Sequence, residues 1–384
     1  MAIDRIRLTL MLGRVVPTPA PAALMQALES VVVNQSGEGR SGFQITFRAE
    51  RGASVTDDFA LLKSEALSPG RRAILIVTIS GTPTVLMDGI ITQHELTPSS
   101  GSTPASLTVT GEDLSVMMDL YDVLMEYPSL PHVAIAGIVI AKYAALGIVP
   151  LIIPAPAVWG LPLQDVFPQR GTDLHYLKEL AETFGYVFYV RPGPVAGMNI
   201  AFWGPSLTGA ARWLPTQRGI NVDMGPATNV NSIQFHYDAL AAAMTIGVAS
   251  DFTLGLPVPF AALTSTRLPP LASQPALPTN APFLRERVLD YRGSNAIEAF
   301  SKAQGQTNDS TANVVTASGV LDVFRYGALL IAPGRVGVRG AGYQYDGEYF
   351  VQTVSHQITQ ENYTQSFTLS REGVGSLVTE VRSR

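Results

Sequence analysis

The most informative stretch of this 384-residue chain is Gly327-Ala-Leu-Leu-Ile-Ala-Pro-Gly-Arg-Val-Gly-Val-Arg-Gly-Ala-Gly342, followed at once by Tyr343-Gln-Tyr-Asp-Gly-Glu-Tyr-Phe-Val351. Short apolar and aromatic runs are separated by glycine, proline and aspartate, a pattern typical of β-strands joined by turns. The same pattern continues on both sides of this stretch. It predicts five strands in this part of the chain: Val320–Phe324, Ala328–Ile331, Val336–Val338, Tyr349–Val354 and Ser366–Ser370.

Two Asp-Gly pairs predict tight hairpins, because both residues of a type I′ turn need positive φ. Asp346-Gly347 would join the strands 343–345 and 349–351, and Asp88-Gly89 would join 85–87 and 90–92. Elsewhere, residues 45–47, 74–79 and 107–109 read as strands, and Val230–Val248 as one long strand with Ile233, Phe235 and Tyr237 on one face. One hairpin in each half of the chain fits two related β-barrels, although no internal repeat is visible.

Helices are expected between the strands. The clearest begins at Thr172 or Asp173, ends at Gly185 and is followed by the strand 186–190. We also expect a buried helix at 131–146 with an apolar strand after it, a helix from Ser294 or Asn295 to Gln304, and a polar loop at 305–313. Two shorter helical stripes are formed by Leu24, Leu28, Val31 and Val32, and by Phe59, Leu62 and Ala66.

The amino-acid composition argues against several classes of function. The chain is 46% hydrophobic and only 15% charged, against a usual charged share of about 25%, which indicates much buried contact surface. The net charge of −5 and the lack of a basic run argue against nucleic acid as a specific ligand. The absence of cysteine excludes disulfides and thiolate metal sites. Prolines at 150, 154, 156 and 162 interrupt the one long apolar stretch, 133–163, so a membrane helix is not expected.

Motifs for catalysis or metal binding do not emerge. The five histidines lack the spacing of a zinc site, and the glycines between 334 and 342 have strands on both sides, unlike a phosphate-binding loop. We therefore expect no catalytic residues, no cofactor and no metal, and a protein that is not an enzyme. Prolines recur from Pro257 to Pro282, which predicts an extended connector.

The stretch 327–351, together with Val354-Ser-His356 and Phe367-Thr-Leu-Ser-Arg-Glu-Gly373, resembles the late control gene D family, the baseplate hub proteins of contractile phage tails and contractile injection systems. The segments 109–114 and 172–189 share the resemblance, which is strongest from 286 to 373. It implies a fold or interface role for the signature positions Gly327, Arg335, Gly340, Gly342, Asp346, Gly347, Tyr349, His356, Phe367, Arg371, Glu372 and Gly373.

The resemblance implies a mainly β fold with some α (α+β), in which two tube-like antiparallel β-barrels are joined by small helical and connector regions. The first barrel would use 1–119, completed by about 228–250. Residues 120–227 would form a helical and strand connector region contributing to the second barrel, 251–285 a Pro-rich connector, and 286–384 the second barrel.

The resemblance also implies the oligomeric state and the partners. It implies a homotrimer whose six barrels adapt a hexameric inner tube to a trimeric spike. Because the sequence ends eleven residues after Gly373, the spike is expected to be a separate polypeptide. Baseplate wedge proteins are further expected partners. Assembly would take place in the bacterial cytoplasm, and the chain would be part of the particle baseplate.

Two other functions stay open. Tyr343, Tyr345, Tyr349 and Tyr363 could form a sugar-stacking platform, as in a carbohydrate-binding, cell-wall-binding or hydrolytic tail-associated β-protein, although cross-strand aromatic pairs also stabilise ordinary sheets. A distal tail protein of a non-contractile phage would share the barrel architecture.

Overall fold

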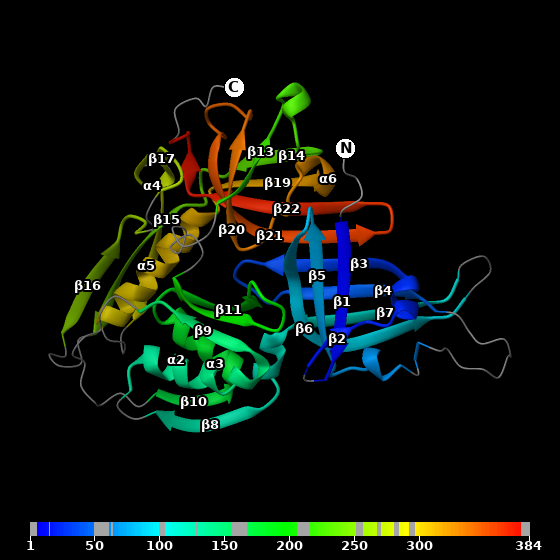
Figure 1. Ribbon diagram of the computed structural model, residues 1–384. Helices are drawn as coiled ribbons and strands as arrows, with labels where there is room; N and C mark the ends of the chain where they lie inside the picture. Colours follow the sequence, from blue (N-terminus) through cyan, green and yellow to red (C-terminus); the bar gives the residue numbers. More distant parts are fainter. Residues whose placement is uncertain are drawn as a thin grey trace.

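The fold is known from a computed structural model, which describes residues 6–14, 16–49, 61–62, 64–99, 104–127, 130–154, 167–205, 216–250, 256–266, 270–279, 284–291 and 296–377. It is mainly β, as the sequence predicts, with helices between the sheets (Figure 1). Of the short stripe expected at 59–66, residues 59, 60 and 63 lie outside these residues, and the described part forms a turn at 61–62 and a 3-10 turn at Glu65–Leu67.

Thirteen strands form one large sheet. Its main path runs in the order β14 (Ser232–Tyr237), β19 (Val315–Asp322), β22 (Tyr363–Arg371), β21 (Gly347–Thr359), β3 (Leu28–Ser36), β4 (Gly42–Arg48), β7 (Ser106–Asp113), β6 (Thr82–Thr97), β5 (Arg72–Ile79), β1 (Ile6–Gly13) and β2 (Thr18–Pro19). Two further strands, β13 (Thr216–Asn221) and β20 (Gly334–Arg339), branch from β21.

The N-terminal and C-terminal parts of the chain share this sheet, because β3 pairs antiparallel with β21 from Ser30–Thr359 to Ser36–Thr353. None of the sheets in the described residues closes into a barrel, so the expected pair of barrels is not seen in the single chain. The segment 228–250 also does not complete the N-terminal part: β14 pairs with β19 of the C-terminal part, and β15 (Ala243–Ser250) belongs to a separate sheet.

The predicted hairpin at Asp88-Gly89 is wrong. β6 runs straight through these residues, and the turn lies at Ser80-Gly81, where both residues have positive φ (49° and 88°). Asp88 is instead fully buried and binds Arg72 on β5 through both oxygens, at 2.6 and 2.7 Å. A buried carboxylate with a bidentate arginine partner is stable inside a strand, which turn propensity alone does not reveal.

The strands expected at 328–331 and 343–345 are also wrong. After β19 the chain forms the short helix α6 (Val323–Tyr326), which Asp322 caps and Gly327 ends with a φ of 73°. Residues 328–333 are irregular, and the connection from β20 to β21 is a loop from Gly340 to Asp346 rather than a two-residue turn. The loop holds two glycines with positive φ, Gly340 and Gly342.

A helical unit packs beside the large sheet. It contains α2 (His132–Ala141), α3 (Asp173–Glu182), the three-stranded sheet β11 (Tyr186–Pro192), β12 (Asn199–Pro205) and β9 (Ile148–Ile152), and the ribbon β8 (Asp122–Tyr127) with β10 (Phe167–Thr172). These helices and strands agree with the predictions for 131–152 and 172–190. Leu177, Ile135 and Trp203 are fully buried in the core between the helices and the sheet.

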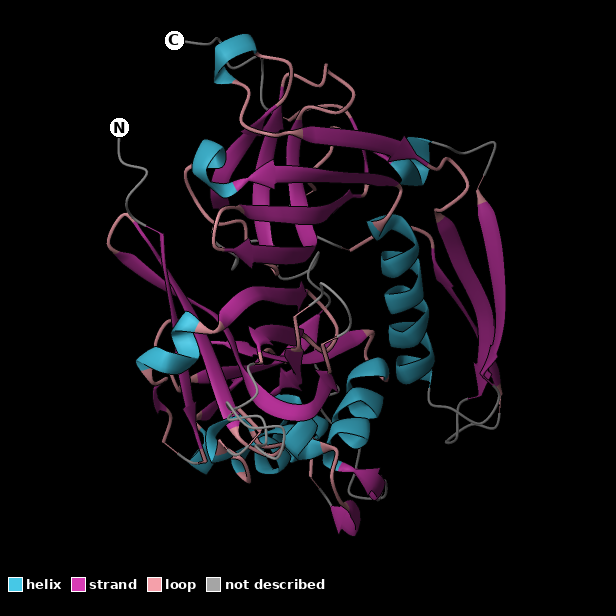
Figure 2. Cartoon of the chain, turned by 90° about the vertical axis from the view of Figure 1, so that its right-hand side faces the viewer, coloured by secondary structure: helices cyan, strands magenta, loops and turns pink. Residues whose placement is uncertain are grey.

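The longest helix, α5 (Ala296–Ala312), continues through the segment expected to be a loop, 305–313. Figure 2 shows it beside a sheet of three strands, β15, β16 (Pro257–Ala262) and β18 (Arg285–Tyr291), so part of the proline-rich connector is a strand.

The stripe at 24–32 is split between α1 (Ala22–Gln26) and β3, because Val31 and Val33 are buried on alternate positions of the sheet. Short elements at β17 (Gln274–Pro275), α4 (Ala276–Thr279) and β23 (Gly373–Val374) close the C-terminal end.

Candidate functional site

One face of the large sheet is polar from β14 to the second half of β6, across eight neighbouring strands. Residues in register share a face of an antiparallel sheet. One row across this face is Gln234, Ser318, Thr368, Thr353 and Ser36, and another is Thr359, Ser30, Thr46, Thr108 and Glu95. We call this surface the polar face.

The alternate residues of the same strands point into the main core. Val31, Val33, Ile45, Phe47, Val109 and Val354 are all at most 1% exposed. This alternation of apolar and polar positions is what an antiparallel sheet with one solvated face requires. The polar face is therefore a water-facing surface, and most of its side chains carry hydroxyl or amide groups.

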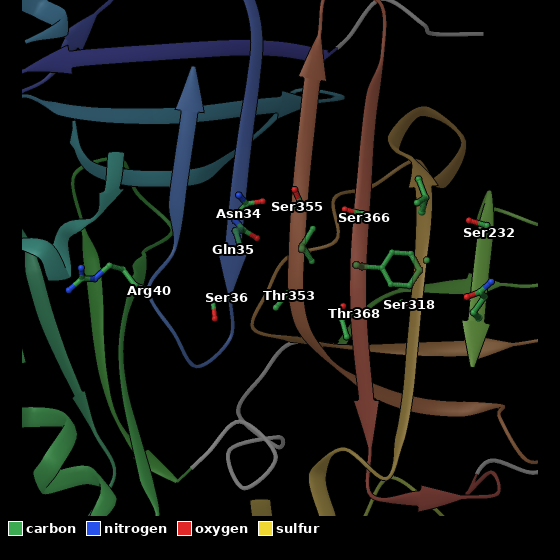
Figure 3. A pocket seen from close by; sticks show the side chains of 15 residues that line it. Asn34, Gln35, Ser36, Arg40, Ser232, Ser318, Thr353, Ser355, Ser366 and Thr368 are labelled. Atoms are coloured by element: carbon green, nitrogen blue, oxygen red, sulfur yellow. The ribbon is translucent and has the colours of Figure 1, made fainter. Parts of the chain in front are cut away.

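The centre of the polar face is hollowed. A cavity of about 610 Å³ lies over β3, β21, β22, β19 and β14. Figure 3 shows that its labelled side chains are polar and, apart from Arg40, uncharged, with Asn34 and Ser355 on neighbouring strands at the joint between β3 and β21. Such a lining offers many weak hydrogen-bonding groups and no cluster of charges. It is therefore more like a solvent-exposed polar surface than a pocket shaped for one small molecule.

The charges near the hollow are neutralised by pairing. Arg40 binds Glu112 and Asp119, each at 2.7 Å. Burial opposes the charge of Arg40, but its hydrogen bonds to the two carboxylates outweigh this and raise the pKa of the guanidinium. For the same reason the pKa of Asp119 is lowered, although partial burial opposes it. The guanidinium charge therefore offsets part of the negative charge of the two carboxylates.

Within the described residues, both ends of the eight-strand span are open strand edges. β14 pairs there only with β19, and Asp238 N–H donates to Val314 O on that side, so the backbone groups of Phe235 point away from β19. At the other end, β5 covers β6 only as far as Ile90, and residues 92–97 have no strand on that side within the described part of the chain. Open edges are sites at which another chain can add.

Six of the twelve signature residues meet around Arg371. This side chain is fully buried, and it donates to the backbone oxygens of Gly373 (2.8 Å), Asp346 (2.8 Å) and Gln344 (2.6 Å). Its guanidinium lies 4.5 Å from the centre of the Tyr349 ring. Burial lowers the pKa of Arg371. The arginine thus holds the loop between β20 and β21 by its backbone.

The neighbours of Arg371 complete this cluster. The Tyr349 hydroxyl donates to Tyr345 O at 2.7 Å, and the Asp346 carboxylate accepts from Ala341 N–H at 2.8 Å. Glu372 accepts from the N–H groups of Leu271 and Ala272, which fastens the segment before β17. Gly347 and Gly373 are required by space, because a Cβ would lie 2.8 Å from the Arg371 guanidinium and 2.2 Å from Gln274 O, respectively.

The other signature residues lie apart from this cluster. Gly340 and Gly342 are in the same loop, Gly327 ends α6, and the Arg335 guanidinium binds Glu348 at 3.2 Å on the neighbouring strand. His356 and Phe367 are buried on β21 and β22. All of these positions stabilise turns or strand pairing, and whether any contacts a partner stays a prediction.

The pKa of His356 is strongly lowered. This side chain is fully buried, and desolvation lowers its pKa to about 3, so the imidazole is neutral at ordinary pH. Its Nδ1 lies 2.8 Å from the Tyr363 hydroxyl and 3.1 Å from Gln365 Nε2. Gln365 in turn binds both backbone groups of Leu330. The histidine belongs to a polar network inside the joint of β21, β22 and β3.

The tyrosines do not form the stacking platform that the carbohydrate-binding alternative requires. Tyr349 and Tyr363 are buried, and the ring of Tyr345 stacks on Phe235 at 5.0 Å. Of the four, Tyr343 alone is widely exposed, at 64%. The observation that favoured carbohydrate binding is therefore lost.

Two kinds of site are absent from the described residues. These residues contain no group of three or more histidine, aspartate or glutamate side chains that could hold a metal ion. No helix among them is both long and apolar enough to cross a membrane.

The fold is shared with solved tail proteins. A tail protein from Neisseria meningitidis superposes with a TM-score of 0.62 at 13% identity, over 96% of this chain and 98% of the other, and the 43 kDa tail protein of prophage MuSo2 from Shewanella oneidensis gives the same values. The Escherichia coli c3393 protein, described as a component of the type VI secretion system similar to T4 tail proteins gp27 and gp5, superposes with a TM-score of 0.53 at 11% identity, over 89% of this chain and 73% of the other.

No family model matches the sequence, and no curated protein matches it. At these identities the superpositions establish the fold alone. The chain thus has the fold of phage tail proteins and of type VI secretion components.

Proposed function

We propose that this chain is the structural baseplate hub of a contractile phage tail or contractile injection system, without catalysis of its own. Three copies would form a ring in which each large sheet continues into the next, and the polar faces would line the central channel. The observation that carries the proposal is the pair of open edges, β14 and residues 92–97 of β6, at the two ends of one continuous polar face.

Closure of the sheets into a ring removes exposed strand edges. A long sheet with free edges invites uncontrolled pairing, and a closed ring of sheets pairs the two edges that meet at each junction. Closed rotational symmetry also gives each copy the same contacts. The low share of charged residues, 15%, suits a subunit that buries much of its surface in an assembly.

The partners follow from the ring. Each copy contributes an N-terminal and a C-terminal group of strands, joined at β3 and β21, so a trimer would present six similar units to a hexameric inner tube and a true threefold axis to a trimeric spike. Baseplate wedge proteins would surround the ring. Assembly would take place in the bacterial cytoplasm before the ring enters the particle. The fold shared with tail proteins supports this setting.

Engineered disulfides test the ring directly, since the chain contains no cysteine of its own. Glu95→Cys on the open part of β6 would be combined in turn with Ser232→Cys, Gln234→Cys and His236→Cys on β14, which scans the unknown register. All four side chains are exposed. Under mild oxidation, at least one pair should yield a closed covalent trimer in denaturing gels.

The matched control combines Glu95→Cys with Val288→Cys, which is 75% exposed on the separate sheet of β18. The control should stay monomeric in the gel. If all three β14 pairs behave like the control, or if they give open ladders without a trimer band, the edge-to-edge ring is wrong.

A further inference from the structure

A third open edge lies at β1, away from the centre of the polar face. β5 covers one side of β1 along its whole length, from Ile6 to Gly13. On the other side, β2 pairs only with Met11 and Leu12, and the chain then leaves at Pro21 to begin α1. Within the described residues, the first half of β1 has no strand on this side.

The hydrogen-bonding groups of that edge can be assigned from the short β2 pairing. Leu10 O accepts from Ala20 N–H at 2.8 Å on the β2 side. Since alternate residues of a strand direct their backbone groups to the same side, the N–H and C=O of Leu8 and the C=O of Ile6 face the open edge. The existing pairing with β2 shows that this edge accepts an extended segment.

An apolar groove adjoins the open edge. A cavity of about 250 Å³ lies between β1, α1, the start of β3, α6 and the turn after β21. Its apolar lining is Ile6, Leu8, Met25, Leu28, Phe324 and Ile358. Phe324 is 45% exposed, although it is one of the largest apolar side chains in the chain. An uncovered aromatic beside unpaired backbone groups marks an interaction site more than an isolated surface residue does.

The rim of the groove is acidic. Glu29 and Glu361 both border the cavity. Glu29 has one ion pair, with Arg48 at 3.2 Å, and Glu361 is exposed on the turn after β21. A basic side chain in the occupant would be complementary to these carboxylates.

We propose that β1 receives an extended segment of a partner polypeptide as an additional strand over Ile6–Thr9. The segment alternates apolar and basic residues: the apolar side chains fill the groove against Phe324, and a basic side chain lies near Glu361. Backbone hydrogen bonds supply affinity, and the groove supplies selection, as in other cases of strand addition. This site does not depend on the ring proposed above.

The probe is the capped peptide (Lys-Val)₄ with a fluorescent label, titrated with the purified chain and followed by fluorescence anisotropy. Two further peptides carry N-methyl groups on all valines or on all lysines. A strand added to one edge uses the N–H groups of alternate residues, so one methylated peptide should bind at least about tenfold more weakly while the other binds like the parent.

Phe324→Asp should weaken binding of the parent peptide by at least about tenfold, because it places a charge in the groove. The matched control is Val288→Asp. Val288 is a more exposed apolar residue on β18, in a separate sheet, and this variant should bind the peptide like wild type. Unfolding curves check that both variants fold. Equal binding of the two methylated peptides, no saturable binding below about 1 mM, or an unaffected Phe324→Asp variant would each overturn the proposal.

Discussion

Replacing Arg371 by methionine is the sharpest test of how the signature cluster stabilises the fold. The variant removes three hydrogen bonds to backbone oxygens and the contact with the Tyr349 ring. Each bond from a charged donor contributes about 1.5–3 kcal/mol and the ring contact about 1–2 kcal/mol. Relief of the buried charge offsets part of this sum. We expect the free energy of unfolding to fall by about 3–5 kcal/mol.

The assay is urea denaturation followed by circular dichroism, with limited chymotrypsin digestion as a local readout at Tyr343, which is exposed in the loop that Arg371 holds. The matched control is Arg339→Met, an exposed arginine on β20, which should change stability by less than about 0.5 kcal/mol. If Arg371→Met loses no more stability than the control, and Tyr343 is cut no faster, the structural role assigned to the cluster is wrong.

Three further predictions concern buried groups. The folded chain binds a proton at His356 only near pH 3 but the unfolded chain near 6.5, so acidification across this window should remove about 4–5 kcal/mol of stability, and His356→Gln should flatten that dependence in urea titrations at stepped pH. Asp88→Ala should cost about 3–5 kcal/mol in the same assay, because both Arg72 and the Asn199 amide lose their buried carboxylate partner, and an Arg72→Met, Asp88→Leu double variant should regain only the part due to the unpaired charge; no recovery would contradict a stabilising role of the ion pair. Gly305→Ala should destabilise the chain in thermal unfolding despite the helix preference for alanine, because its Cβ would lie 2.5 Å from Gly185 Cα; a raised melting temperature would refute this.

Periodicity predicted the elements whose signals are local. α3 was recognisable because Thr172 caps it and an apolar stripe faces the core, and its cap is present: the Thr172 hydroxyl accepts from His175 N–H at 3.2 Å. β9 and β11 followed from apolar runs next to glycine. In these cases the residues that define the element are neighbours in sequence, so tertiary contacts reinforce the local preference.

The failures have tertiary causes. Asp88-Gly89 has the composition of a turn, but the Arg72 partner that keeps Asp88 in a strand is 16 residues away. Gly305 looked like the start of a loop, but it lies inside α5 where the helix backbone approaches Gly185. Distant partners of this kind leave no periodic signal.

The polar face was missed for the same reason. Each strand shows only alternation, and single residues such as Ser355 or Thr368 carry no motif. Their alignment across eight strands depends on the pairing register, in particular on the joint of β3 with β21, whose residues are more than 300 positions apart. The signature glycines could be found because their positive φ or close contacts restrict the residue type.

The most direct test of the central claim is cryo-electron microscopy of tail particles from a producing cell, with this chain fitted into the density between inner tube and spike. The hub proposal predicts three copies around a threefold axis, with β14 of one copy beside β6 of the next and the polar face, including Ser355, lining the channel. Particles that form without the chain, or a fit in which the polar face points outward and the two edges do not meet, would contradict it.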